Sequence, residues 1–191
     1  MPNGPGFANS RLGAALKGFR RARDGATAVE FGLVAFPFIF ALLAIMEIAM
    51  VMWSGEVLEK AVAAASRKIY TGEFQSDAGN ATKTTAQLQT AFKQLVCDEV
   101  SPLIKCADIF IDVRDASSFS GATPPSPIKV SDKTFDATAF TYKAVAANQI
   151  GLVTAAVEYK TFFPPLGGTK LANGNRVLLA TAAFRTEPYT N

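Results

Sequence analysis

The longest hydrophobic segment of the chain lies at residues 26–53, where Glu30 and Glu47 are the only charged residues. Residues 31–46 carry no charged side chain. A helix needs about 20 apolar residues to cross the hydrocarbon core of a bilayer. The pattern therefore predicts a transmembrane segment at about residues 31–53, with Trp53 as an anchor at the membrane interface.

Two other interpretations of this segment stay open. It could be a buried helix of a globular domain. It could also belong to a cleaved secretory signal, because Ala61-Val62-Ala63 has the small-x-small form of a signal peptidase site. However, the apolar run is longer than the roughly 7–15 residues of such a signal, and charged residues separate it from the triplet. We therefore favour the transmembrane helix.

Beyond Trp53 the pattern becomes amphipathic. Apolar residues recur at helical spacing on one face: Val57, Leu58, Ala61, Val62, Ala65 and Ile69. Gly72 suits the position after a helix C-terminus. A single long helix is therefore expected within residues 26–72, and Pro37 is expected to kink or loosen it by removing one backbone donor.

The remaining residues, 73–191, predict a small α+β head. Its expected elements are a loop at 73–82, a helix at 84–97, strands at 109–114, 150–163 and 177–185, a long Pro/Ser loop at 117–131 and an ambiguous segment at 135–145. Asn173-Gly174 is a hairpin signal between the last two strands. We expect an antiparallel sheet of about three to four strands beside one further helix.

The charge is unevenly distributed. The 191 residues carry a formal charge of +3, but residues 1–25 hold five basic side chains and one acidic one, which leaves −1 for the remainder. Basic residues before an apolar helix favour a cytoplasmic N-terminus, so the head is expected in the periplasm. The positive charge thus belongs to the N-terminal flank, and we expect no nucleic-acid partner.

The composition excludes several kinds of active site. There is no histidine, which rules out a Ser-His-Asp triad, a Cys-His pair and imidazole metal ligands. Two cysteines cannot form a four-cysteine zinc or iron–sulfur site. Asp108, Asp112 and Asp115 are close in sequence, but such a cluster is more often a solvated edge than a metal site. We expect no metal, no cofactor, no small-molecule substrate and no enzymatic activity.

Cys97 and Cys106 have eight residues between them. If the head is periplasmic, they lie where disulfides persist. A bond between them would tie the end of the predicted head helix to the start of the first strand. The alternative is a pair of unrelated buried thiols.

The segment RRARDGATAVEFGLVAF, at residues 20–36, joins a basic flank to the apolar helix. It resembles the processing site of type IV prepilin-like proteins, in which a membrane peptidase cuts after the glycine. The resemblance implies that residues 1–25 are a cleaved leader and that Gly25 is the last leader residue. Ala26 then becomes the new N-terminus, Glu30 the fifth mature residue, and Phe31 follows it.

The longer segment from Gly25 to Trp53, with Pro37 and Glu47, resembles the N-terminal part of TadE-like proteins of the Tad (Flp-type) pilus systems. The stretch AASRKIYTGEFQ, the two cysteines and the closing FRTEPY are similar to that family as well. The resemblance implies a minor pseudopilin that is needed for pilus assembly and surface attachment. It implies an inner-membrane location and, as partners, a prepilin peptidase, other pilins and pseudopilins, and the pilus assembly platform.

The two acidic residues of the apolar segment have different expected roles. A carboxylate in an apolar helix is costly and marks function, and Glu30 can neutralise the α-amino group of a neighbouring subunit in a helical bundle. Glu47 lies 17 residues further on, about 25 Å along the helix and about 100° around it. Glu47 is therefore expected to be solvated, to contact lipid headgroups, or to pack against a partner helix.

Two other functions are alternatives to the pseudopilin. The chain could be an uncleaved single-pass anchor or adhesion protein, or a membrane-tethered enzyme. The residue at the N-terminus of the membrane-extracted protein distinguishes the anchor from the pseudopilin.

Overall fold

The computed structural model describes residues 25–100, 102–162 and 171–189. Residues 1–24 of the predicted leader lie outside the described residues, as does Phe163 at the end of the third predicted strand. The chain divides into two compact units, Met1–Ile45 and Met46–Asn191. One helix, α2 (Ala26–Tyr70), contributes to both.

In the first unit, α2 exposes its apolar side chains. Phe31, Leu33 and Phe36 are 75%, 72% and 76% exposed, and most of the other large apolar residues before Met46 are exposed as well. The helix continues without a break through Pro37. An exposed apolar surface of this extent is typical of a helix that contacts lipid or other helices.

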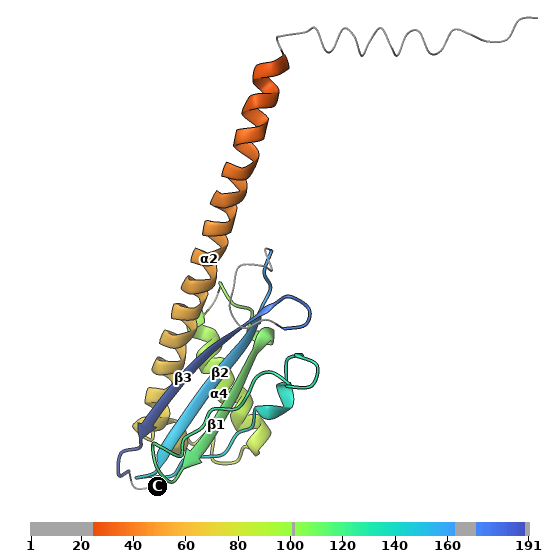
Figure 1. The fold of residues 1–191 in the computed structure, drawn as a ribbon. Coiled ribbons are helices and arrows are strands. Elements are labelled where there is room, and N and C mark those ends of the chain that lie inside the picture. The colour runs from red at the N-terminus through yellow and green to blue at the C-terminus, as the bar shows by residue number, and fades with distance from the viewer. Residues whose placement is uncertain (1–24, 101, 163–170, 190–191) are drawn as a thin grey trace, which may run out of the picture. The chain divides into compact units, whose positions relative to one another are not determined.

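The second unit is an α+β fold, as the sequence predicts. It contains the rest of α2, the short helix α3 (Glu73–Ser76), the helix α4 (Thr85–Val100), and strands β1 (Ile109–Ala116), β2 (Ile150–Tyr159) and β3 (Arg176–Arg185). The three strands form one antiparallel sheet in the order β1-β2-β3 (Figure 1). Two short 3-10 turns lie at Cys106–Asp108 and Ala137–Ala139.

The core lies between the sheet and the two long helices. The amphipathic face of α2 supplies Leu58, Val62 and Ile69, each at most 1% exposed. Phe92 and Val96 of α4 join them, together with the side chains on one sheet face: Ile109, Ile111, Val113, Val153, Ala155 and Val157. The apolar periodicity at residues 57–69 therefore reflects packing inside the head.

Most predicted head elements are present with shifted ends. Helix 84–97 extends to Val100, strand 109–114 extends to Ala116, and strand 150–163 ends at Tyr159. The expected loop at 73–82 contains the four-residue helix α3. The short helix α3 and the longer α4 follow from contacts with the core, because Phe74 and Val100 are both buried.

The ambiguous segment 135–145 is neither a regular strand nor a helix. Residues Ala137–Ala139 form a 3-10 turn, and Tyr142 then makes an isolated parallel bridge with Val113 of β1. The Val113 N–H donates to the Thr141 carbonyl at 2.9 Å, and the Lys143 N–H donates to the Val113 carbonyl at 2.7 Å. This segment thus covers the outer edge of β1 without forming a fourth strand.

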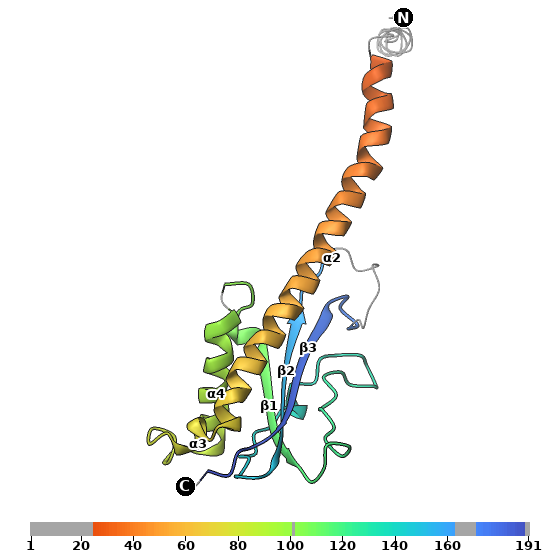
Figure 2. The ribbon, with the colours of Figure 1, turned by 90° about the vertical axis from the view of Figure 1, so that its left-hand side faces the viewer.

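The connection between β1 and β2 also covers the second face of the sheet (Figure 2). The Asp112 carboxylate, fully buried on this face, accepts hydrogen bonds from Arg114 Nε and Nη2, both at 2.6 Å. The Thr141 N–H donates to the same carboxylate at 3.0 Å. Asp112 is therefore not part of a solvated edge: its hydrogen bonds hold the connection against the sheet.

A disulfide joins Cys97, near the end of α4, to Cys106, just before β1, with a Cα–Cα distance of 5.2 Å. It closes a short loop, and Cys97 is only 6% exposed. The bond fixes the end of α4 relative to the first strand.

Replacing both Cys97 and Cys106 with alanine is expected to lower the free energy of unfolding by about 2–3 kcal/mol, because the unfolded chain regains the entropy of a loop of this length. Denaturation of the full chain in detergent micelles measures the change. Each single alanine variant is the control and should lose a similar amount, since either one breaks the bond. Two reactive thiols in the denatured, unreduced wild-type chain would contradict the prediction.

Candidate functional site

The N-terminal site predicted from the sequence lies at the start of α2. Gly25 is exposed and immediately precedes the helix, which begins at Ala26. A Cβ atom added to Gly25 would meet no atom within 4 Å. The chain's own fold therefore does not require a glycine at this position.

Glu30 and Phe31 are both exposed, and both lie in the first two turns of α2. A carboxylate near a helix N-terminus is favoured by the unpaired N–H groups there. Because Glu30 and Ala26 are four residues apart, they lie on the same side of the helix. Cleavage between Gly25 and Ala26 would thus place a new ammonium group and this carboxylate close to each other along α2.

Glu47 lies far from this motif and contacts the head. Its Oε1 accepts a hydrogen bond from the backbone N–H of Phe162 at 2.7 Å. Phe162 follows β2 and is 115 positions away in the chain. This contact is not among the neighbours expected for Glu47 from the sequence, which were solvent, lipid headgroups and a partner helix. No pattern in the sequence connects the two residues.

Two segments singled out by the resemblance meet at the end of α2. Gly72 adopts a left-handed conformation, with φ of 78°, and the ring of Tyr189 packs where a side chain at Gly72 would lie. The Glu187 N–H also donates to the Tyr70 carbonyl at 3.0 Å. The closing FRTEPY sequence therefore caps the long helix, a structural role.

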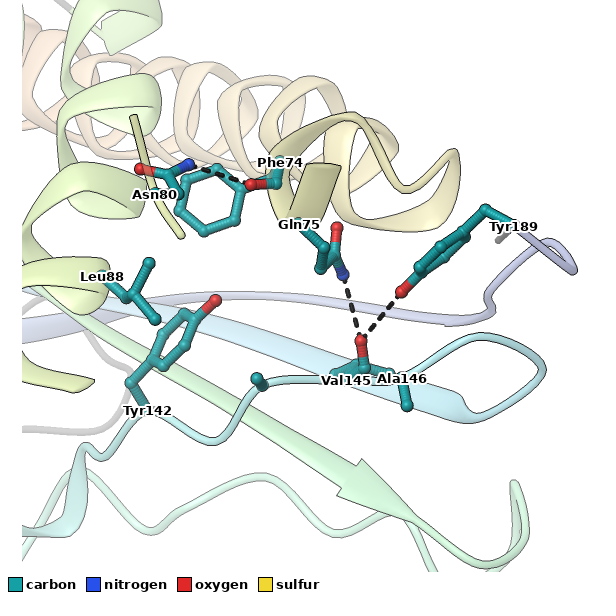
Figure 3. Close-up of a pocket in the computed structure, with 9 residues that line it drawn as sticks. Phe74, Gln75, Asn80, Leu88, Tyr142, Val145, Ala146 and Tyr189 are labelled. Atoms are coloured by element: carbon teal, nitrogen blue, oxygen red, sulfur yellow. Dashed lines mark hydrogen bonds between the residues drawn. The ribbon is translucent and has the colours of Figure 1, made fainter. Parts of the chain in front are cut away.

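A groove of about 240 Å³ lies beside this cap, between α3, α4 and the segment that precedes β2 (Figure 3). The Val145 carbonyl accepts hydrogen bonds from Gln75 Nε2 at 3.1 Å and from the Tyr189 hydroxyl at 3.0 Å. Burial raises the pKa of Tyr142 to about 12, so its phenol stays protonated at neutral pH. The Gln75 amide and the Tyr189 hydroxyl thus hold the segment before β2 through its Val145 carbonyl.

The three aspartates of the first strand region do not converge on one site. Asp112 pairs with Arg114, whereas Asp115 pairs with Lys143 Nζ at 2.7 Å. The hydrogen bond from Lys143 holds the pKa of Asp115 below its usual value. In the part of the chain that the structure describes, no three His, Cys, Asp or Glu side chains are grouped so that they could hold a metal ion.

The helix at Thr27–Tyr70 is long and apolar enough to cross a membrane. Its most apolar stretch of 18 residues has a mean hydropathy of 2.4, and only 11% of that stretch is buried. The low burial argues against the core helix of a globular domain. A secretory signal cut after Ala63 is also disfavoured, because Ala61 and Val62 are buried in the head core, each 1% exposed. The helix fits a single-pass membrane protein.

Comparison with known proteins finds a similarity in the N-terminal part of the chain. Residues 25–67, which are 43 of the 191 residues, match the family model described as TadE-like protein. Neither curated proteins nor solved structures give a match. The matched segment starts at Gly25 and contains Glu30, Phe31, Pro37 and Glu47. The N-terminal helix of this chain is therefore a TadE-like segment, consistent with a TadE-like Tad pilus protein.

Proposed function

We propose that this protein is a minor pseudopilin that a prepilin peptidase processes and that assembly of Tad (Flp-type) pili requires. The observation that carries the proposal is the TadE-like match, which begins at Gly25, on a helix whose apolar side chains are exposed. A helix with this surface needs lipid or other helices around it. Both are available to a pilin-like subunit, first in the inner membrane and then in a bundle.

Processing after Gly25 changes the charge of the subunit. It removes five basic side chains and one acidic side chain and leaves the remaining side chains with a formal charge of −1. It also creates an α-amino group at Ala26. In a bundle, the Glu30 carboxylate of one subunit neutralises this amine on its neighbour, which favours one axial stagger between the helices.

The head argues for an assembly role. Unlike a short shaft subunit, the chain continues past α2 into a separately folded α+β unit that a disulfide stabilises. In the proposed topology, residues 1–25 are cytoplasmic and the head is periplasmic, where it meets other pilins, pseudopilins and the assembly platform. The role is structural and non-enzymatic, and it serves pili that attach cells to surfaces.

The N-terminal residue and intact mass of the membrane-extracted protein test this proposal. We expect a chain that begins at Ala26, with the 25-residue leader absent. If the full-length chain is the only species in cells that make Tad pili, the pseudopilin proposal fails. The uncleaved single-pass anchor then accounts for the helix and the head.

Replacing Glu30 with alanine is expected to leave cleavage largely intact and to reduce the number of pili by about tenfold or more. The reason is that the amine of the neighbouring subunit loses its counter-charge in an apolar bundle. Counting pili by electron microscopy, together with immunoblots of the processed chain, measures both effects.

Glu56 provides the matched control, since it is an exposed glutamate on the same helix beyond the uncharged segment. The Glu56→Ala variant should assemble normal numbers of pili. Normal pilus numbers in the Glu30→Ala strain would contradict the proposed role of this carboxylate.

A further inference from the structure

The segment that follows β2 reaches α2 at Glu47. The backbone N–H of Phe162 donates to Glu47 Oε1 at 2.7 Å, whereas the side chain of Phe162 is 89% exposed. Figures 1 and 2 both show the end of β2 running beside α2. Phe162 therefore lies at the same level along the helix axis as Glu47.

This level coincides with the end of the uncharged apolar segment. The 16 uncharged residues at positions 31–46, at 1.5 Å per residue, span about 24 Å, most of the roughly 30 Å thickness of a hydrocarbon core. Placing an ionised carboxylate further inside would be costly. Glu47 is thus expected at the outer edge of the core, six residues nearer the N-terminus than the Trp53 boundary that the sequence pattern indicates.

The chemistry around Phe162 fits a lipid surface. Met46, Met52 and Trp53 of α2 are 65%, 67% and 56% exposed, so apolar side chains are displayed on the helix at and beyond this level. Lys160, which is also exposed, precedes Phe162 by two residues. An aromatic ring with a nearby lysine is typical of segments that lie at the boundary between headgroups and acyl chains.

We propose that Phe162 inserts into the outer leaflet of the membrane and gives the head a second contact with the bilayer beside α2. The Glu47 carboxylate positions the segment by holding its backbone at the edge of the hydrocarbon core. The inference rests on the membrane-spanning part of the proposed function and is independent of processing and pilus assembly.

Tryptophan fluorescence in vesicles tests the proposal. Trp53 is the only tryptophan of the chain, so a Trp53→Phe background accepts one new tryptophan at a time. The full chain is reconstituted in phosphatidylcholine vesicles, with and without bromine on the acyl chains. We expect Phe162→Trp to lose about half of its emission or more in the brominated vesicles, as a side chain 5–10 Å below the headgroups would.

Two matched phenylalanine positions calibrate the measurement. Phe38→Trp lies inside the apolar segment and should be strongly quenched. Phe119→Trp is a further exposed position, 58% exposed, three residues after the end of β1. Because Ala116 pairs with Ile150 at the start of β2, Phe119 lies at the opposite end of the sheet from Phe162. It should show no quenching.

Quenching of Phe162→Trp and Phe38→Trp but not Phe119→Trp supports the inference. An unquenched Phe162→Trp beside a quenched Phe38→Trp overturns it. If the emission of that unquenched Phe162→Trp is also shifted to the blue, a protein surface covers the ring instead. Absence of quenching at both Phe38→Trp and Phe162→Trp overturns the inference together with the membrane-spanning assignment of α2.

Discussion

Replacing Asp112 with alanine is expected to lower the free energy of unfolding by about 3 kcal/mol, near the lower end of the cost of breaking a buried ion pair. The carboxylate is fully buried and accepts hydrogen bonds from Arg114 and from the Thr141 backbone. Without it, the Arg114 guanidinium and the Thr141 N–H lose their acceptor. The partial exposure of the Arg114 side chain, 33%, keeps the cost from being larger. Denaturation of the full chain in detergent micelles measures it.

Asp115 supplies the matched control on the same strand. Its partner Lys143 has a side chain that is 68% exposed, and the pair lies near the surface. The Asp115→Ala variant should therefore lose less than about 1 kcal/mol. An Asp112→Ala variant as stable as the Asp115→Ala variant would show that the buried pair does not hold the β1–β2 connection in place.

The same pair explains why residues 135–145 could not be assigned from the sequence. Their conformation depends on hydrogen bonds to Val113 and Asp112, which are about 30 positions earlier in the chain. Local propensity carries no information about such contacts. The long helix, in contrast, was predictable because its hydrophobic pattern, its length and Gly72 after its end are local features.

Strand β2 illustrates a second limit of prediction from the sequence. A strand with simple alternation would bury only one face, here that of Val153 and Ala155, but Leu152, Thr154 and Ala156 on the other face are buried as well, each at most 2% exposed. The near-continuous run of apolar and small residues was the available signal, since a strand covered on both faces shows little alternation. What covers the second face depends on the long connection, whose Pro/Ser-rich sequence predicts only a loop.

The residues of the candidate site also differ in how far the sequence alone predicts their arrangement. Gly25, Ala26, Glu30 and Phe31 form a local motif, so their spacing on a helix start follows from the sequence alone. The contact between Glu47 and Phe162 joins residues from opposite parts of the chain, and only the folded structure brings them together. The sequence therefore predicts the processing motif, and the structure adds the contact between Glu47 and the segment after β2.

Replacing Gly25 with leucine is expected to reduce the processed chain by at least about tenfold, which corresponds to ~1.4 kcal/mol or more of lost transition-state stabilisation in the peptidase. The structure makes this test specific. A Cβ atom added to Gly25 meets no atom within 4 Å, so the helix start has room for a side chain at this position. An effect that the Gly32 control does not share therefore arises where the peptidase binds the cleavage site. Immunoblots and intact mass of the membrane-extracted protein measure the ratio of full-length to processed chain.

Gly32 is the matched control for this variant. It lies on the same helix, is exposed, and an added Cβ likewise meets nothing within 4 Å. The Gly32→Leu variant should be cleaved as efficiently as the wild-type chain, because leucine suits an apolar helix and leaves the Gly25–Ala26 bond unchanged. If Gly25→Leu is processed like wild type, the cut does not follow Gly25. If both variants fail equally, the defect lies in membrane insertion of α2, before the peptidase acts.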